Sequence, residues 1–329
     1  MQGPSMKPSF KAPWWARSPH TQTIVPLLAQ PNEQPLQWQR LDTPDGDFID
    51  LAWLDYPRPE QPIVLILHGL EGSANSHYAK RILANAKSQG LAPVVHHHRN
   101  CSEQPNRLAR SYHSGDTQDI ALTLAHLQAE YPDSPIWAVG YSLGGNVLTK
   151  YLGEQGDNSA IQRAVVVSAP LQLSACAKRL EKGFSKVYQS YLIKQLQARV
   201  LHKLAQPELA AQMPLANDQV SQLTTFYQFD DKVTAPLHGF NGVDHYYQQA
   251  SGLPYLKSIT TPTLVLHAAD DPFMTDAVIP TPAQLSESVE YELCQGGGHV
   301  GFIEGGTPWK PRFYLERRIL SFLTGESQC

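Results

Sequence analysis

The sequence predicts an α/β fold in which helices flank a mostly parallel, eight-stranded sheet and a helical cap is inserted late in the chain. Three observations carry this prediction. Short apolar segments recur with helical stretches between them, one of these segments leads through a glycine-rich turn into a helix, and the alternation stops between residues 171 and 258. Alternating strands and helices are typical of a right-handed, mostly parallel sheet.

The expected strands follow in order along the chain. The first two flank the turn signal Pro44, Asp45 and Gly46, which predicts a β-hairpin. The eight expected strands are residues 36–41, 48–54, 63–67, 92–96, 136–139, 164–168, 263–267 and 289–293. With 329 residues, 42% of them hydrophobic, the chain can bury a sizeable core, so residues 1–329 are expected to form a single domain.

Residues 171–258 form too long a stretch for a plain loop and predict a helical cap inserted over the functional site. Apolar residues recur at helical spacing from Phe184 to Leu204, so one long helix or a broken pair is expected there. The same stretch is basic, and attraction to a membrane surface is one interpretation. A solvated outer face of a cap helix is the simpler one. The basic residues are Lys178, Arg179, Lys182, Lys186, Lys194, Arg199 and Lys203.

Ser142 lies in a Gly-x-Ser-x-Gly pentad, residues 140–144, between an apolar strand and a helix-compatible stretch. Strand, tight turn and helix in this order are typical of a nucleophile elbow. Gly140 and Gly144 are expected to let strand and helix approach each other closely. Such a pentad occurs by chance in about one chain of this length in ten, so its partners decide the interpretation.

A serine nucleophile of this type needs an acid and then a histidine further along the chain, each after a strand. Asp270 and Asp271 follow one expected strand, and His299 follows the last strand after three glycines. Adjacent residues that leave a strand point to opposite sides, so only one aspartate can face the histidine. Asp271, backed by Pro272, is the expected acid. Asp270 is the second choice and otherwise caps the turn.

Two backbone N–H groups, those of Leu70 and Leu143, are candidates for an oxyanion hole. Such donors are each worth about 3 kcal/mol in a transition state. The arrangement predicts acyl transfer, in which Ser142 attacks a carbonyl, His299 takes its proton and Asp271 orients the imidazole. Water then releases the acid from an acyl-serine. This chemistry needs no metal and no organic cofactor.

Several motifs spread over most of the chain are jointly specific. They are residues 13–15 and 18–23, the HGLEGS turn at 68–73, residues 106–107 and 112–115, the serine pentad, the ADDPF loop at 269–273, and GGGHVGFIEG at 296–305. Together they resemble the YheT-like branch of the α/β-hydrolase family, whose relatives include ABHD lipid hydrolases and yeast medium-chain ester acyltransferases. The resemblance implies an α/β-hydrolase fold and a carboxylic-ester hydrolase with Ser142, Asp271 and His299 as its triad. It does not extend to residues 99–103, where the family's Arg-Gly-Cys-Ser-Gly is Arg-Asn-Cys-Ser-Glu.

The predicted function is hydrolysis of short-chain, medium-chain or lipid-like acyl esters. Two alternatives stay open: an acyltransferase that passes the acyl group to an alcohol, and a non-catalytic binding module on the same fold. The aromatic side chains of the cap are expected to pack within the cap or, alternatively, to line an acyl pocket. They are Phe226, Tyr227, Phe229, Phe240, Tyr246 and Tyr247. The tryptophans Trp14 and Trp15 are weaker candidates for the same role.

Composition argues against several other classes. The net charge of −4 disfavours a nucleic-acid partner. Residues 1–30 lack the apolar core of a signal peptide, and no segment is apolar enough to span a membrane.

The widely spaced cysteines predict reduced thiols and a cytoplasmic protein. They are Cys101, Cys176, Cys294 and Cys329. Neighbours in a strand point to opposite faces, so the triplet at 96–98 predicts no metal site.

Overall fold

The computed structural model describes residues 10–325, in which eight strands form one sheet in the order β1-β2-β4-β3-β5-β6-β7-β8. The strands are β1 (Gln37–Asp42), β2 (Phe48–Trp53), β3 (Ile63–Leu67), β4 (Ala92–His96), β5 (Ile136–Tyr141), β6 (Ile161–Val167), β7 (Thr263–Ala268) and β8 (Val289–Cys294). Strand β2 pairs antiparallel with β1 and β4, and every other pair in this sheet is parallel. The predicted α/β architecture is confirmed, strand by strand.

A small second sheet was not predicted. Strands β9 (Ile303–Thr307) and β10 (Lys310–Phe313) form an antiparallel hairpin beside the N-terminal segment. Glycine and proline are depleted in strands, and this hairpin contains Gly305, Gly306 and Pro311. Its formation depends on packing rather than on local preference, because Trp15 Nε1 of the short helix η1 (Trp14–Ala16) donates to Gly306 O at 3.1 Å.

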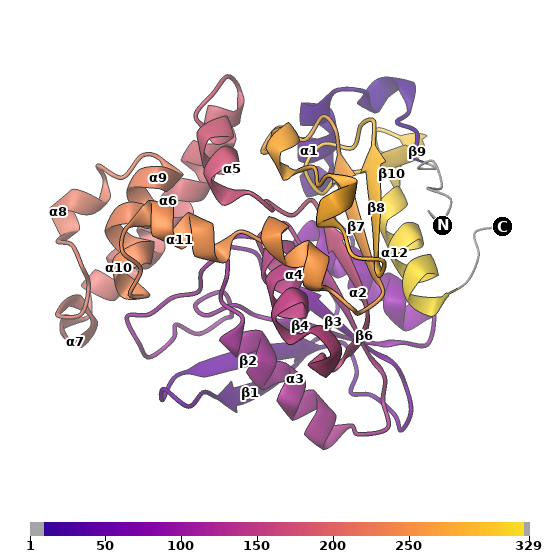
Figure 1. Ribbon diagram of the computed structural model, residues 1–329, viewed down its shortest axis with the longest axis horizontal. Coiled ribbons are helices and arrows are strands. Elements are labelled where there is room, and N and C mark those ends of the chain that lie inside the picture. The colour runs from indigo at the N-terminus through magenta and orange to yellow at the C-terminus, as the bar shows by residue number, and fades with distance from the viewer. Residues whose placement is uncertain (1–9, 326–329) are drawn as a thin grey trace.

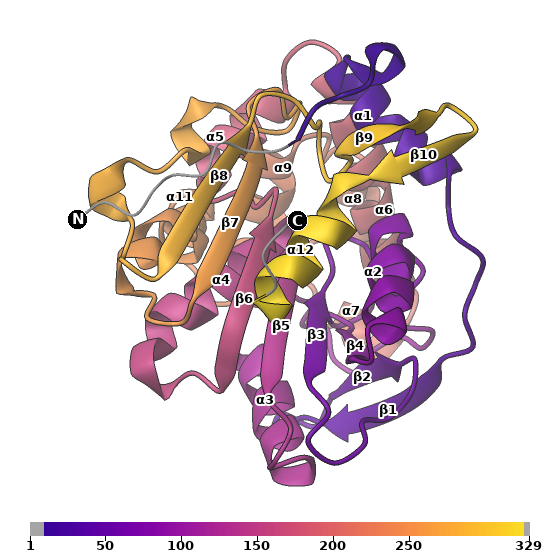
Figure 2. The same ribbon diagram turned by 90° about the vertical axis from the view of Figure 1, so that its right-hand side faces the viewer.

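Helices cover both faces of the main sheet (Figures 1 and 2). One face packs against α2 (His77–Ser88) and α12 (Tyr314–Thr324), and the other against α3 (Gln118–Glu130) and α4 (Leu143–Gln155). Alternation along β3 shows how the sequence builds both interfaces. Its even-numbered side chains join the core beneath α2 and α12, and its odd-numbered side chains join the core beneath α3 and α4.

Only helices and loops connect β6 to β7, and in Figure 1 they lie to one side of the sheet. The helices are α5 (Leu173–Leu180), α6 (Ser185–Leu204), α7 (Pro207–Ala210), α8 (Asn217–Val220), α9 (Phe226–Phe229), the π-helical turn η3 (Asp230–Thr234), α10 (Ala235–Leu237), α11 (Val243–Ala250) and η4 (Leu253–Ser258). Helix α6 is the long helix that the apolar spacing predicts. The rest of the stretch forms short helices whose boundaries the spacing did not indicate.

The basic stretch does not form one solvated face. Lys178, Lys182, Lys186 and Lys194 are exposed. Lys203 is buried, and its ammonium group donates to Ala109 O at 2.7 Å and Arg110 O at 2.8 Å. Arg199 Nε donates to Glu71 Oε2 at 3.0 Å. The interpretation of the whole stretch as an outer face is therefore wrong for Lys203, which is buried, whereas Arg199 is partly exposed. Both charges bind groups on the body of the protein and so hold α6 onto it.

One helix and three single turns are the remaining elements of residues 10–325. Helix α1 (Pro19–Leu28) lies near the N-terminus, and η2 (Gly156–Asn158), η5 (Asp276–Val278) and η6 (Pro282–Gln284) are single 3-10 turns.

In the loop after β4, Asn100 adopts a φ of 66°, a conformation that asparagine tolerates better than most residues. Asn100 Oδ1 accepts a hydrogen bond from Asn106 N at 3.2 Å. An asparagine thus takes the place of the family's glycine.

The turn from β5 into α4 is tightly packed. Ser142 adopts φ 50° and ψ −117°, a strained conformation for a residue with a side chain. A Cβ atom on Gly144 would lie 2.4 Å from Leu67 O, and one on Gly140 would lie 2.6 Å from Gly144 O. Glycine is required at both positions because the helix start touches the ends of β3 and β5.

We expect Gly144→Ala to lower the free energy of unfolding by at least about 3 kcal/mol, because the contact is with backbone that cannot move aside. Urea denaturation followed by tryptophan fluorescence would measure the change. Gly90→Ala is the matched control, since Gly90 has a φ of 77° but open space around it. The free energy of unfolding of that control should fall by only about 1–2 kcal/mol, because alanine disfavours the left-handed conformation. Equal losses in the two variants would contradict the packing argument.

Candidate active site

The structure brings Ser142, His299 and Asp271 into one hydrogen-bonded line. His299 Nε2 lies 3.0 Å from Ser142 Oγ, and His299 Nδ1 lies 2.8 Å from Asp271 Oδ2. The three residues come from the β5–α4 turn, the loop after β8 and the loop after β7. All three loops leave the carboxyl ends of parallel strands, where the side chains of open α/β sheets converge.

The two adjacent aspartates point to different partners. Asp271 is buried and binds His299. Its carboxylate also accepts a hydrogen bond from Phe273 N at 2.8 Å. Asp270 Oδ1 instead accepts from Gly298 N at 3.0 Å, and burial raises the pKa of Asp270. Asp270 thus fastens the glycine loop that precedes the histidine.

The candidate oxyanion donors lie beside the serine. Leu143 follows Ser142 directly, and the turn that contains Leu70 abuts it, since a Cβ on Gly69 would lie 3.2 Å from Ser142 Cβ. Within residues 10–325 neither the Leu70 nor the Leu143 N–H donates to another protein group. Both residues line the same cavity as Ser142 and His299. The two donors are therefore free to bind an oxygen there.

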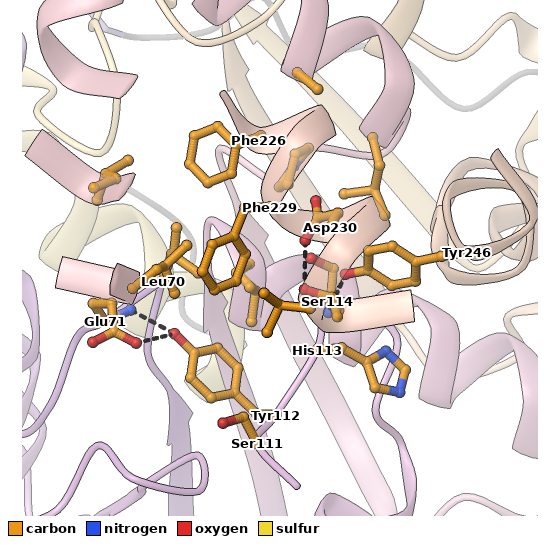
Figure 3. A pocket seen from close by; sticks show the side chains of 18 of the residues that line it. Leu70, Glu71, Ser111, Tyr112, His113, Ser114, Phe226, Phe229, Asp230 and Tyr246 are labelled. Atoms are coloured by element: carbon orange, nitrogen blue, oxygen red, sulfur yellow. Dashed lines mark hydrogen bonds between the residues drawn. The ribbon is translucent and has the colours of Figure 1, made fainter. Parts of the chain in front are cut away.

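Glu71 fixes the turn next to Leu70. It adopts a φ of 52°, and its N–H donates to Tyr112 Oη at 2.8 Å. The Tyr112 hydroxyl donates in turn to Glu71 Oε1 at 2.9 Å, and both bonds are drawn in Figure 3. The second carboxylate oxygen takes the bond from Arg199 on α6. Glu71 thereby connects the cap to the turn that carries Leu70, a link that the sequence did not indicate.

The N-terminal helix holds the histidine loop. Thr23 Oγ1 accepts from His299 N at 3.0 Å, and Gln22 Oε1 accepts from Ile303 N at 2.6 Å. A Cβ on Gly301 would lie 1.9 Å from Gln22 O, so the loop and α1 are in direct backbone contact. Gln22 and Thr23 belong to one of the sequence motifs, residues 18–23, but no local pattern assigns them a role. Their distance of more than 270 residues from His299 hides the contact from any local pattern.

Phe273 packs on the imidazole. Its ring stacks on His299 at 4.0 Å between centroids with an interplanar angle of 4°, and its other neighbour is Tyr188 of α6 at 5.0 Å. Tyr188 Oη lies 3.0 Å from His20 Nδ1 on α1. The histidine is thus oriented by an aspartate along its edge and by an aromatic ring on its face.

A cavity of about 140 Å³ opens beside Ser142 between the sheet and the cap. Its lining is mostly apolar, and Figure 3 shows Phe226 and Phe229 reaching toward it from the cap. Tyr246 and Tyr247 also line it, whereas Tyr227 is exposed and Phe240 packs on His113. Trp14 is exposed, outside this cavity. Part of the aromatic set therefore lines a pocket, as its composition suggested.

Burial shifts the pKa of two of the ionisable groups that line this cavity. Burial raises the pKa of Asp230 to about 6, although its carboxylate accepts hydrogen bonds from Thr234 Oγ1 at 2.7 Å and Tyr247 Oη at 2.8 Å. Burial lowers the pKa of Lys203 to about 8. Both shifts have the same cause, since an apolar surrounding disfavours the charged form of either group.

One set of side chains in residues 10–325 has metal-like spacing. His113, Asp116 and His238 place ligand atoms within 4.8 Å of one another. Arg110 Nη2, however, donates to both carboxylate oxygens of Asp116, at 3.0 and 3.1 Å. The guanidinium occupies the oxygens that a cation would need and repels it, so we interpret this cluster as a structural ion pair beside two neutral histidines.

The histidine triplet at 96–98 follows the alternation expected of a strand. His96 Nδ1 lies 2.9 Å from Thr123 Oγ1, His97 Nε2 accepts from Ala74 N at 3.1 Å, and His98 Nε2 lies 3.1 Å from His68 O. Burial lowers the pKa of each ring, which favours neutral imidazoles. The triplet packs the end of β4 and is satisfied by separate partners.

Two structural facts bear on cellular context. Cys101, Cys176 and Cys294 are buried free thiols, and Cys329 lies outside the described residues. None of the helices in residues 10–325 has the length and hydropathy needed to cross a bilayer.

The chain is similar to known esterases and lipases in sequence and in fold. Residues 62–306 match the family model described as alpha/beta hydrolase fold. YheT of Escherichia coli (strain K12), which bears an esterase name, is 47% identical over 93% of this chain and 90% of its own. Phospholipase ABHD3 of Homo sapiens is 29% identical over 94% of this chain and 77% of its own. The esterase Pf2001 of Pyrococcus furiosus has a similar structure, with a TM-score of 0.57 at 17% identity over 97% of this chain and 98% of that one.

The buried Lys203 makes stability depend on pH. Its pKa of about 8 in the folded chain lies below the ordinary 10.5, so between these values the unfolded chain binds more protons. Stability from this group therefore rises with pH. From about pH 7.5 to about pH 10 the native protein should gain about 2 kcal/mol relative to Lys203→Met, measured by urea unfolding. Lys194→Met, an exposed change on the same helix, should leave the pH dependence unaltered. If the free energy of unfolding depends on pH in the same way in the native protein and in Lys203→Met, the pKa of Lys203 is not lowered in the folded chain.

Proposed function

Because the chain belongs to the family with the alpha/beta hydrolase fold, we propose that it is a serine carboxylic-ester hydrolase acting on acyl esters. The hydrogen-bonded line from Ser142 through His299 to Asp271, at the wall of an apolar cavity, carries the proposal. Neither a metal nor an organic cofactor enters this chemistry.

Each residue has a role that follows from its contacts. Ser142 Oγ attacks the acyl carbonyl while His299 Nε2 takes its proton. Asp271 keeps the proton of His299 on Nδ1 and stabilises the imidazolium that forms. The Leu70 and Leu143 N–H groups receive the negative oxygen, and each such donor lowers the barrier by about 3 kcal/mol. The imidazolium then protonates the leaving alcohol, and His299 activates the water that releases the acid from Ser142.

The cavity favours an apolar acyl group. Cap side chains such as Phe226 and Phe229 form its far wall, and burying a hydrocarbon chain gains about 0.8 kcal/mol per methylene group. The relatives named phospholipase and monoacylglycerol lipase act on acyl esters by their names, which supports the same substrate class here. We therefore assign residues 171–258 as a substrate-binding cap. The buried free thiols support a cytoplasmic location.

The first test is hydrolysis of p-nitrophenyl esters from acetyl to palmitoyl. Ser142→Ala should lower kcat by at least about 10³-fold at every chain length, because the nucleophile is lost. Activity of the native protein should peak at one chain length, which the cavity sets. Ser88→Ala, an exposed serine on α2, is the matched control and should be fully active.

Three outcomes would redirect the interpretation. Equal inactivity of the native protein and Ser142→Ala would favour a binding module. Formation of a new ester on addition of an alcohol, in place of free acid, would favour an acyltransferase. A flat chain-length profile would contradict the acyl cavity.

We expect the ionisation of Asp230 to make the preference for acyl-chain length depend on pH. Its carboxyl is neutral below about pH 6 and charged above, because burial raises its pKa to about 6. A charge in the cavity opposes an apolar chain, so the ratio of kcat/KM for long over short esters should fall about tenfold as pH rises through this value. Taking the ratio cancels any effect of pH on the chemical step, which affects both esters alike.

Asp230→Asn should keep the ratio high and independent of pH. Asp244→Asn changes an exposed aspartate of α11 and should behave like the native protein. A ratio that still falls with pH in Asp230→Asn would show that another group controls it.

A further inference from the structure

Helix α6 presents an apolar stripe to solvent. Phe184, Val187 and Tyr191 follow one another at intervals of three and four residues, which places them on one side of the helix. Val187 is 54% exposed and Tyr191 66% exposed, although side chains of these types are usually buried. A row of this kind indicates a surface that is covered in use.

Helix α1 continues this surface. Ile24, Leu27 and Leu28 are exposed along it, and Leu28 is 82% exposed. The two helices touch at one end, where His20 packs on Phe184 with ring centroids 4.5 Å apart. We call the exposed apolar side chains of both helices the α1–α6 face: Ile24, Leu27, Leu28, Phe184, Val187 and Tyr191.

The charged side chains on α6 are basic, and the acidic Glu181 lies in the loop just before this helix. Lys182, Lys186 and Lys194 are exposed beside the stripe of α6, and neither α1 nor α6 contains an aspartate or glutamate. Helices with aromatic and aliphatic side chains on one side and lysines flanking them are typical of segments that lie in the head-group region of a bilayer. The lysines add attraction to anionic lipids.

The face lies next to the site. Thr23 of α1 binds the backbone of His299, and Tyr188 of α6 reaches the same histidine through Phe273. In Figure 1, α1 and the loop between α5 and α6 lie at the same end of the molecule. A surface that docked there would bring its own acyl esters close to Ser142.

We propose that the α1–α6 face docks on the surface of an anionic lipid bilayer, from which the protein takes its acyl esters. The docking follows from the exposed side chains alone, whereas the delivery of esters rests on the proposed function. A second copy of the chain fits this face less well, because a twofold contact would place the lysines of both copies opposite one another.

Vesicle sedimentation tests the docking without hydrolysis. The protein with Ser142→Ala is mixed with vesicles of phosphatidylcholine alone or of phosphatidylcholine and phosphatidylglycerol in equal amounts. We expect binding to the anionic vesicles that weakens as salt is raised. Adding Val187→Glu and Tyr191→Glu should weaken this binding at least about tenfold by removing the apolar contact. Lys186→Glu with Lys194→Glu should weaken it by a similar factor.

Matched controls lie elsewhere on the surface. Tyr56→Glu changes an exposed tyrosine after β2, and Lys257→Glu an exposed lysine on η4, which packs on α4. Neither should alter vesicle binding. Because the readout is binding by a variant without its serine, it stays informative if p-nitrophenyl ester hydrolysis fails.

Three results would overturn the proposal: no binding to anionic vesicles, equal losses in the control variants, or a dimer in solution that Tyr191→Glu dissociates. The last result would assign the face to a second copy. Binding to phosphatidylcholine alone that equals binding to anionic vesicles would refute the role of the lysines and with it the choice of an anionic surface.

Discussion

The close contact between the start of α4 and the end of β3 is the constraint on which the rest of this structure depends. It leaves no room for a side chain at Gly144, and it holds Ser142 at a positive φ. Strain of this kind costs of order 1–3 kcal/mol and persists only where the surrounding packing fixes it. Here a buried parallel sheet fixes it, with the Ser142 N–H bonded to Val167 O of β6 at 2.8 Å. The serine is therefore presented rigidly, before any substrate binds.

The histidine is positioned differently from the serine. Its loop contains several residues with positive φ, among them Val300 and Phe302, which a short loop cannot hold by itself. Two separate parts of the chain support it: the loop after β7, through Asp271 and the ring of Phe273, and α1, through Thr23. The N-terminal helix thus belongs to the site, although it lies outside the 62–306 segment that matches the family model. Removing α1 would leave the backbone N–H of His299 without its acceptor.

Sequence reasoning reached what local chemistry determines. The short apolar segments with helical stretches between them and the glycines around Ser142 are local signals, and they predicted the sheet and the elbow. The alternation of side chains after a strand indicated that only one of the two aspartates could face the histidine, and Pro272 behind Asp271 favoured that residue. The two aspartates do point to different partners. Contacts between distant segments could not be predicted in this way. The ion pair of Arg199 with Glu71, the burial of Lys203, the contact of Thr23 with His299 and the hairpin of β9 and β10 each depend on a partner remote in sequence.

Glu71 shows how such remote contacts join the cap to the chemistry of this ester hydrolase. Its backbone continues from Leu70, a proposed oxyanion donor, and its buried carboxylate binds Arg199 of α6 and the hydroxyl of Tyr112. The Glu71 carboxylate is buried whereas Arg199 is partly exposed, so loss of the arginine would leave a buried negative charge without the opposite charge that compensates it. Movement of α6 away from the sheet would therefore release the turn that carries Leu70. The proposed substrate-binding cap and the proposed oxyanion donor are held by the same carboxylate, so a shift of the cap would also move the donor.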